Sequence, residues 1–205
     1  MNNLELKPFT KEQVRQLRRE NFEQASNPST WMIQSQQLWK DARTLWNARA
    51  EDRKRRAESI NCMSEFSLSA REKLSLALDL TDRSAFILMG LAIENAMKGL
   101  FVAEFPEAMS SEKLEDTFPK TGHDLLKLKL RLACINDIEV DQRLLNGLSD
   151  HLYWLGKYPV PKNKKDIDYQ LDSADFGRSE VFLRCLFNAL VSVQVEKQEN
   201  HKMPD

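Results

Sequence analysis

The sequence has few of the residues that end or bend helices, with 6 glycines and 7 prolines among 205 residues. It also lacks any sustained alternation of apolar and polar residues of the kind that forms a half-buried strand. The residues that favour helices, such as Leu, Ala, Glu and Lys, are abundant. The scarcity of turn signals therefore predicts long helices, and the length is sufficient for a hydrophobic core.

Cysteine is also scarce, and its three copies lie far apart in the chain, at Cys62, Cys134 and Cys185. An odd number of cysteines without a close pair argues against a disulfide framework and against a zinc knuckle. We therefore expect these cysteines to be free and buried, as small apolar side chains.

Neither sign of charge dominates, because 30 Lys and Arg stand against 31 Asp and Glu, for a formal net charge of -1. Binding of nucleic acid or of an anionic membrane would need a local basic patch. The longest uninterrupted apolar stretch, Ala85–Ile93, is too short to span a bilayer, and the first ten residues lack the apolar run of a signal peptide. These absences predict a cytoplasmic protein without a membrane partner.

Common catalytic signatures are absent as well, since the sequence holds no HExxH, P-loop lysine motif, GxGxxG or GxSxG. A di-iron bundle needs Glu-x-x-His pairs, but Met97 stands three residues after Glu94 and no such pair occurs in the chain. His123 is the first histidine, so the earlier His that an HD-type phosphohydrolase needs is missing. We therefore expect no bound metal and no cofactor.

Helix signatures, in contrast, recur along the chain. Thr10 and Gln13 form a capping box that starts a first helix, and Asn27-Pro28-Ser29 ends it and starts a second one. The apolar stripe of the second helix repeats every seven residues, at Trp31, Leu38 and Leu45 and, one place along, at Met32, Trp39 and Trp46. Further helices are predicted after a capping box at Ser69 and Glu72, at Ser84–Phe105, His123–Cys134 and Val140–Leu155, and after a cap at Asp172 or Ser173.

These segments predict an all-α fold of the up-down antiparallel helical bundle type. The bundle is expected over residues 29–198, after a helical extension at 1–28 and before a polar tail at 199–205. The helix at Ser84–Phe105 is apolar on nearly every side and is therefore expected at the centre. The charged segment Arg49–Ser59 is either a solvated, ion-paired extension or a nucleic-acid contact through Arg49, Arg53, Lys54, Arg55 and Arg56.

Glu94 and Lys98 are unusual because they lie one turn apart in a helix that otherwise has almost no charge. A buried charge without a partner costs several kcal/mol, so each of the two side chains should be paired or face a cavity. Two interpretations stay open: an ion pair that fixes helix packing, or a pocket formed by Glu94, Asn95 and Lys98. His123 and His151 are ambiguous in the same way, because each could carry chemistry or only cap and pack its helix.

Three segments in order resemble the HEPN family of helical bundles. They are LAIENAMKGLFV at Leu91–Val102, with Glu94 four residues before Lys98; TGHDLLKL at Thr121–Leu128, with His123 and Asp124; and WLGKYPVP at Trp154–Pro161. The resemblance covers about Trp31 to Lys197 and leaves the first helix outside it.

The resemblance implies a bundle that is usually dimeric and is associated with RNA. Many members are metal-independent endoribonucleases of toxin or anti-phage systems, while others bind RNA or nucleotides without catalysis. Family catalysis is attributed to an Arg and a His that are separated by four to six residues. This chain has Lys157 at the corresponding place and no His at that spacing, so any catalysis would use His151, Lys157 and His123 in another arrangement.

The sequence therefore supports three hypotheses. The first is an RNA- or nucleotide-associated binding protein in defence or stress, the second is a metal-independent endoribonuclease or toxin, and the third is a structural dimerisation module. The expected partners are a second copy of the chain, RNA or a nucleotide, and an antitoxin or nucleotidyltransferase. The residues expected to bind are Glu94, Asn95, Lys98, Asp124, Tyr158, Lys162, Lys164 and Lys165.

Overall fold

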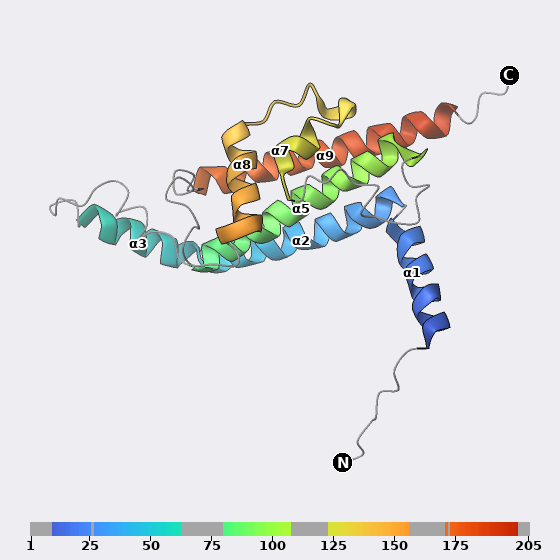
Figure 1. Ribbon diagram of the computed structural model, residues 1–205. Helices are drawn as coiled ribbons and strands as arrows, with labels where there is room; N and C mark the ends of the chain where they lie inside the picture. The colour runs from blue at the N-terminus through green and yellow to red at the C-terminus, as the bar shows by residue number, and fades with distance from the viewer. Residues whose placement is uncertain are drawn as a thin grey trace, which may run out of the picture.

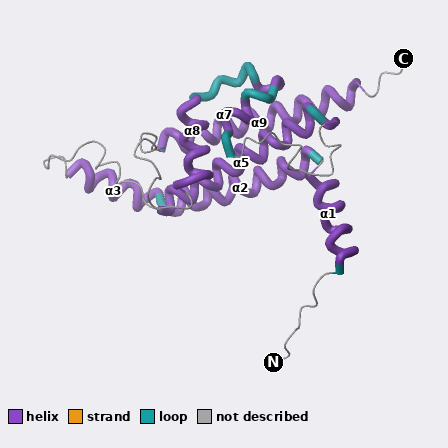
Figure 2. Tube along the Cα trace, viewed as in Figure 1, coloured by secondary structure: helices purple, strands orange, loops and turns teal. Residues whose placement is uncertain are grey.

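The computed structural model describes residues 10–25, 27–62, 80–107, 123–155, 171 and 173–200. Helices account for 87% of the structure, and these residues contain no strand, which confirms the all-α fold class (Figure 2). The described α-helices are α1 (Lys11–Ala25), α2 (Pro28–Ala48), α3 (Ala50–Cys62), α5 (Leu80–Glu104), α7 (Leu125–Lys129), α8 (Gln142–Asp150) and α9 (Ser173–Asn200).

The three longest helices, α2, α5 and α9, lie side by side and form the body of the fold (Figure 1). α2 runs antiparallel to α5, whereas α9 runs in the same direction as α5. Trp46, Phe86 and Phe176 mark one end of the three helices: the rings of Trp46 and Phe176 stack at 4.3 Å, and the Phe86 ring meets both edge-on. α8 crosses these helices, and α1 and α3 project from opposite ends of α2 (Figure 1).

α5 is the central helix, as its sequence predicts, because it packs against both α2 and α9. Its buried side chains include Phe86, Met89, Ile93, Met97 and Leu100. Gly99 permits a close approach of α2, since an added Cβ would lie 3.1 Å from Trp31 Cβ and 3.2 Å from the Pro28 carbonyl oxygen. The segment Asp82–Glu104 has the length and hydropathy of a membrane span, but 72% of its apolar window is buried among the other helices.

Local sequence signals place the first helix boundaries as expected. The Thr10 hydroxyl accepts from the Gln13 N–H at 3.2 Å, and the Gln13 side chain accepts from the Thr10 N–H at 2.8 Å. Asn27 then caps α2 by accepting from the Ser29 N–H at 2.9 Å, with Pro28 in the first turn. These bonds satisfy N–H groups that have no partner inside their own helices.

The helix predicted at His123–Cys134 is shorter in the structure, because α7 ends at Lys129. Arg131 and Leu132 donate to carbonyls three residues back, at 3.2 and 3.0 Å, so the last turn tightens instead of continuing as an α-helix. A 3₁₀ turn, η3 (Ala133–Ile135), follows and carries Ile135 into the core. The prediction of buried cysteines is also wrong for Cys134, which is exposed, while Cys185 is half-buried and both are free.

The helix predicted at Val140–Leu155 is divided into two parts. α8 begins only at Gln142, because Asp141 caps it by accepting from the Arg143 N–H at 2.8 Å. From His151 to Leu155 the chain forms a π-helix, η4, whose turn is wider by one residue. The widening alters the direction in which Tyr153 points relative to a continued α-helix.

Several charged side chains of the segment after α2 form ion pairs. Asp52 lies 2.7 Å from both Arg49 and Arg55, and Arg53 lies 3.1 Å from the buried Asp82. The Arg53 guanidinium also stacks 3.6 Å from the Trp46 ring centre. These contacts favour the ion-paired interpretation over a nucleic-acid contact. The helix predicted after Ser69 lies outside the described residues. So do residues 156–165, which Gly156, Pro159 and Pro161 predict to be a loop.

Candidate functional site

A buried carboxylate on α5 organises the main polar cluster of the described residues. The Glu94 side chain is 3% exposed, yet its Oε1 lies 2.6 Å from Lys98 Nζ and its Oε2 lies 2.8 Å from His123 Nδ1. Each carboxylate oxygen therefore has its own cationic or hydrogen-bonding partner. The expectation that Glu94 and Lys98 are largely buried and paired is confirmed, while His123 as the second partner of Glu94 was not foreseen.

Lys98 is held between a charge and an aromatic ring. Its side chain is 23% exposed, and its Nζ lies 5.5 Å from the ring centre of Trp31 on α2 while it bonds to Glu94. An ammonium near an indole face is attracted by the negative potential of the ring. Lys98 thus links α5 to α2 and keeps a cationic group at the edge of the core.

His123 precedes α7 and is fixed from two sides. Its ring bonds to Glu94, and its backbone N–H donates to the Tyr153 hydroxyl oxygen at 2.7 Å. The two rings also meet nearly edge-on, with centres 5.3 Å apart. The His123 side chain remains 40% exposed, so it is both oriented and open to solvent.

Tyr153 contacts His123 from the π-helix. One turn earlier, Ser149 of α8 contacts the start of α7. The Ser149 hydroxyl accepts from the Leu125 N–H at 3.0 Å and donates to the Leu145 carbonyl at 2.7 Å. An N–H at the start of α7 is thereby capped by a side chain of α8. The segment 149–153 consequently fixes the position of His123 relative to α5.

The contact with Glu94 indicates which nitrogen of the His123 ring carries the hydrogen. A carboxylate that holds an ammonium group accepts hydrogen bonds, so Nδ1 of His123 carries the hydrogen that points to Glu94. Nε2 is then the ring nitrogen that can exchange a proton with a ligand. A carboxylate-oriented imidazole beside a Lys ammonium can act in proton transfer and can bind an anion.

Asp124, expected among the binding residues, has a structural task. Its Oδ1 accepts from the Lys127 N–H at 3.0 Å as the N-cap of α7, and its Oδ2 lies 2.9 Å from Lys127 Nζ. Burial alone would raise the pKa of this carboxyl group, but the hydrogen bonds and charge of Lys127 together hold it below its ordinary value. Asn95 is half-buried on α5 beside Glu94.

His151, expected to be a catalytic group, lies in the core. It is 2% exposed, its Nδ1 donates to the Gly147 carbonyl at 2.8 Å, and its ring packs 5.4 Å from Phe86. Burial lowers the pKa of His151 to about 4, to which the positive charge of Arg83 also contributes. The imidazole is therefore neutral at pH 7 and packs as a core residue, away from the solvent that a ligand would share with His123.

The remaining expected site residues, Lys157, Tyr158, Lys162, Lys164 and Lys165, lie outside the described residues. Tyr153 and Ser149 belong to the cluster but were not identified from the sequence as site residues. Their role depends on the π-helix and on contacts between residues 24 and 30 positions apart, and neither has a local sequence signal.

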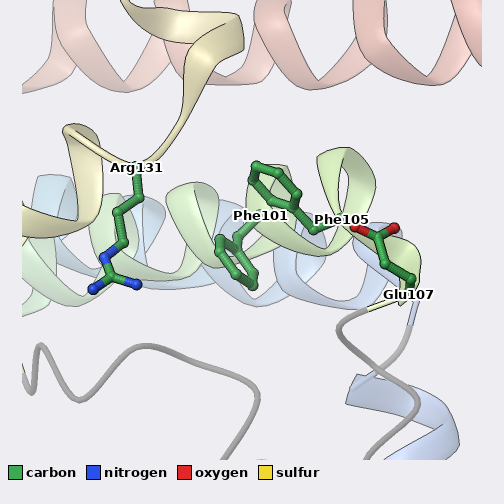
Figure 3. A pocket seen from close by; sticks show the side chains of 4 residues that line it. All are labelled: Phe101, Phe105, Glu107 and Arg131. Carbon is green, nitrogen blue, oxygen red and sulfur yellow. The ribbon is translucent and has the colours of Figure 1, made fainter.

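A separate hollow of about 310 Å³ lies further along α5 and is lined by Phe101, Phe105, Glu107 and Arg131 (Figure 3). Its aromatic side chains lie between the two charged groups, with Arg131 at one end and Glu107 at the other (Figure 3). None of the polar-cluster residues lines it. In the described part of the chain, no group of three or more His, Cys, Asp or Glu side chains could hold a metal ion.

Comparisons with protein-family models, with curated proteins and with solved structures gave no match to this chain.

Proposed function

We propose that the chain is an RNA- or nucleotide-associated binding protein with a HEPN-like bundle, active in defence or stress, and that it binds at the polar cluster of Glu94, Lys98, His123 and Tyr153. The observation that carries this proposal is the buried Glu94 carboxylate, which orients Lys98 and His123 at the edge of the core. Lysine ammonium and histidine N–H groups are donors for phosphate oxygens.

Aromatic rings stand beside both of these donors. Trp31 lies next to Lys98, and Tyr153 lies next to His123. Sites for single-stranded nucleic acid combine cationic groups with aromatic side chains on which bases stack. The loop with Lys157, Tyr158, Lys162, Lys164 and Lys165 would add the local positive charge that the neutral total does not supply.

The HEPN-like topology is part of the same proposal. Two of the three segments that carry the resemblance meet at the cluster, since Glu94 and Lys98 come from one and His123 comes from the next. The antiparallel packing of α2 against α5 fits a bundle of this kind.

Binding can be tested by fluorescence anisotropy with a labelled single-stranded RNA and with a labelled adenine nucleotide. We expect Lys98→Ala to weaken binding at least about tenfold, which corresponds to about 1.4 kcal/mol. Lys40→Ala is the matched control, because Lys40 is an exposed lysine on α2 and should leave binding unchanged. Equal affinity of both variants and the parent would contradict the proposal, as would the absence of binding by the parent protein.

A second candidate, a metal-independent endoribonuclease, is favoured by the 2.8 Å contact between Glu94 and His123. In this reaction Nε2 of His123 takes the proton of an RNA 2′-hydroxyl, whose oxygen then attacks the adjacent phosphorus. The bond to the 5′ oxygen breaks, and that oxygen receives a proton from a water molecule, while the proton held by His123 returns to the solvent. Lys98 would stabilise the extra negative charge on the phosphorane, and the products are a 2′,3′-cyclic phosphate and a 5′-hydroxyl.

The two candidates differ in what His123→Asn should do. Cleavage of RNA in EDTA by the parent, lost in His123→Asn and kept in His201→Asn, would establish the nuclease. A 2′-deoxy residue at the cleaved position should block the reaction. Binding of RNA without any cleavage by the parent would leave the binding protein as the better description.

A further inference from the structure

The outer face of α9 is apolar although it is exposed to solvent. The core side of the helix presents Phe182, Leu183, Leu186 and Leu190, all buried. On the opposite side, Val181, Val191 and Val195 are 63%, 51% and 46% exposed. The whole chain is 30% charged, but this face has Arg184 as its one charged residue between Val181 and Val195.

The exposed residues follow a coiled-coil spacing. Val181, Arg184, Asn188, Val191 and Val195 are separated alternately by three and four residues, which is the a/d pattern of two associating helices. Val181, Asn188 and Val195 then occupy a positions, and Arg184 and Val191 occupy d positions. The Arg184 guanidinium lies 5.8 Å from the centre of the Trp39 ring on α2, to one side of this row of residues. The line along which two such helices would touch, the seam, is therefore formed mainly by the valines and Asn188.

Gly177 lies on the same face, seven residues before Arg184. A Cβ added there would meet nothing within 4 Å, so packing inside the protomer does not require a glycine. Glycine in an exposed helix is destabilising relative to alanine. A second helix that approaches closely would account for its presence.

We propose that this face, defined by Val181, Asn188, Val191 and Val195, is where two copies of the chain associate as a parallel, in-register pair of α9 helices. A second copy fits because Asn188 at a central a position can donate to and accept from its own counterpart. In a parallel pair the two Asn188 side chains meet in the same layer, with a valine layer seven residues on either side. β-branched residues at a positions favour two strands, and a single Asn there fixes the register.

The proposal does not depend on RNA binding, because the α9 face shares no residue with the Glu94 cluster. It also specifies an arrangement. The two helices should touch from about Ala174 to Val195, which is about 33 Å of helix at 1.5 Å per residue.

Sedimentation of the full-length chain between about 1 and 100 μM tests the association. We expect a dimer that Val181→Glu/Val191→Glu weakens at least about tenfold, since each charge would be buried at the seam. Ile33→Glu is the control, because Ile33 is 64% exposed on α2 and should leave the dimer intact. Circular dichroism should show unchanged helix content in both variants, as their sites are at the surface.

Disulfide trapping tests the orientation. In the parallel arrangement Val181→Cys should form a covalent dimer with its own counterpart on mild oxidation, well above the amount that the parent cysteines give. An antiparallel pair would instead trap Val181→Cys with Val195→Cys on mixing, and would overturn the proposed register. A monomer at every concentration, or a dimer that the Val181→Glu/Val191→Glu change leaves intact, would overturn the proposed surface.

Discussion

Two places on α5 use the same combination of a buried acid, a cation and a tryptophan, and they differ in the number of partners of the acid and in how exposed those partners are. At Asp82 the partner is Arg53, which is stacked on Trp46 and largely covered. At Glu94 the partners are Lys98 beside Trp31 and His123, whose side chain is 40% exposed. The first pair is closed and holds α3 to the bundle, while the second leaves an ionisable ring in contact with solvent. Both acids are buried, so burial of the acid does not distinguish the two places. The exposed His123 makes the Glu94 cluster a candidate site, whereas the covered Asp82–Arg53 pair only stabilises the fold.

The largest expected effect is that of Glu94→Ala on stability. The change leaves a partly buried Lys98 without its carboxylate and releases His123, so we expect a loss of about 3 kcal/mol. Thermal unfolding should show a melting temperature lower by several degrees. Glu51→Ala, at an exposed acid on α3, should change it little. If Glu94→Ala lowers the melting temperature no more than Glu51→Ala does, the Glu94 cluster is not a buried charged site comparable to the Asp82–Arg53 pair.

Acid should destabilise the protein through the buried His151. Its folded-state pKa of about 4 lies below the ordinary value of 6.5, so the unfolded chain binds more protons between these values. Stability is therefore lost as the pH falls from about 6.5 to about 4, by about 2 kcal/mol between pH 7 and pH 5. Urea unfolding of the parent and of His151→Gln at both pH values measures this. An equal pH dependence in the two proteins would show that His151 is not the group responsible.

The stability that the Asp82–Arg53 pair provides should depend on the shape of the cation as well as on its charge. Arg53→Lys keeps the positive charge but loses the planar group that stacks on Trp46 and donates to its carbonyl. We expect a loss of about 1 kcal/mol in urea unfolding and no change in RNA or nucleotide affinity. A decrease in affinity would show that the two places are not functionally separate.

The smallest stability effect is expected at Tyr153. Tyr153→Phe removes the acceptor of the His123 N–H and should cost about 0.5–1 kcal/mol, since that N–H can turn to water. The same change should weaken ligand binding, because His123 loses one of its two fixed points. Chemical denaturation and anisotropy measured on one preparation separate these effects. Unchanged binding would mean that the bond to Glu94 alone orients the ring.

The sequence predicted those features that depend on neighbouring residues. The capping box at Thr10 and Gln13 and the start of α2 at Pro28 need only three or four residues to form, and both are confirmed. The burial of Glu94 followed from the apolar helix around it. The contact of Glu94 with His123 joins residues 29 positions apart and depends on how α7 docks, which no local pattern encodes.

The burial of His151 could have been read from the sequence. Leu144, Leu148 and His151 are spaced by four and three residues, which places the histidine on the apolar side of its helix. The π-helix that follows had no such signal, and with it the contribution of Tyr153 was missed. The early end of α7 was also unpredictable, because Leu132 and Ile135 reach the core from turns and not from a longer helix.

The packing of α9 against α2 and α5, which come much earlier in the chain, has a consequence for how the protein is made. α2 and α9 meet through contacts such as that between the Trp39 indole N–H and Glu180, which are 141 residues apart. During synthesis α2 and α5 can pair early, but their faces toward α9 stay uncovered until the last part of the described chain has left the ribosome. Closure of the bundle therefore comes late and joins distant parts of the chain, the kind of contact that forms slowly and leaves nascent protein open to aggregation.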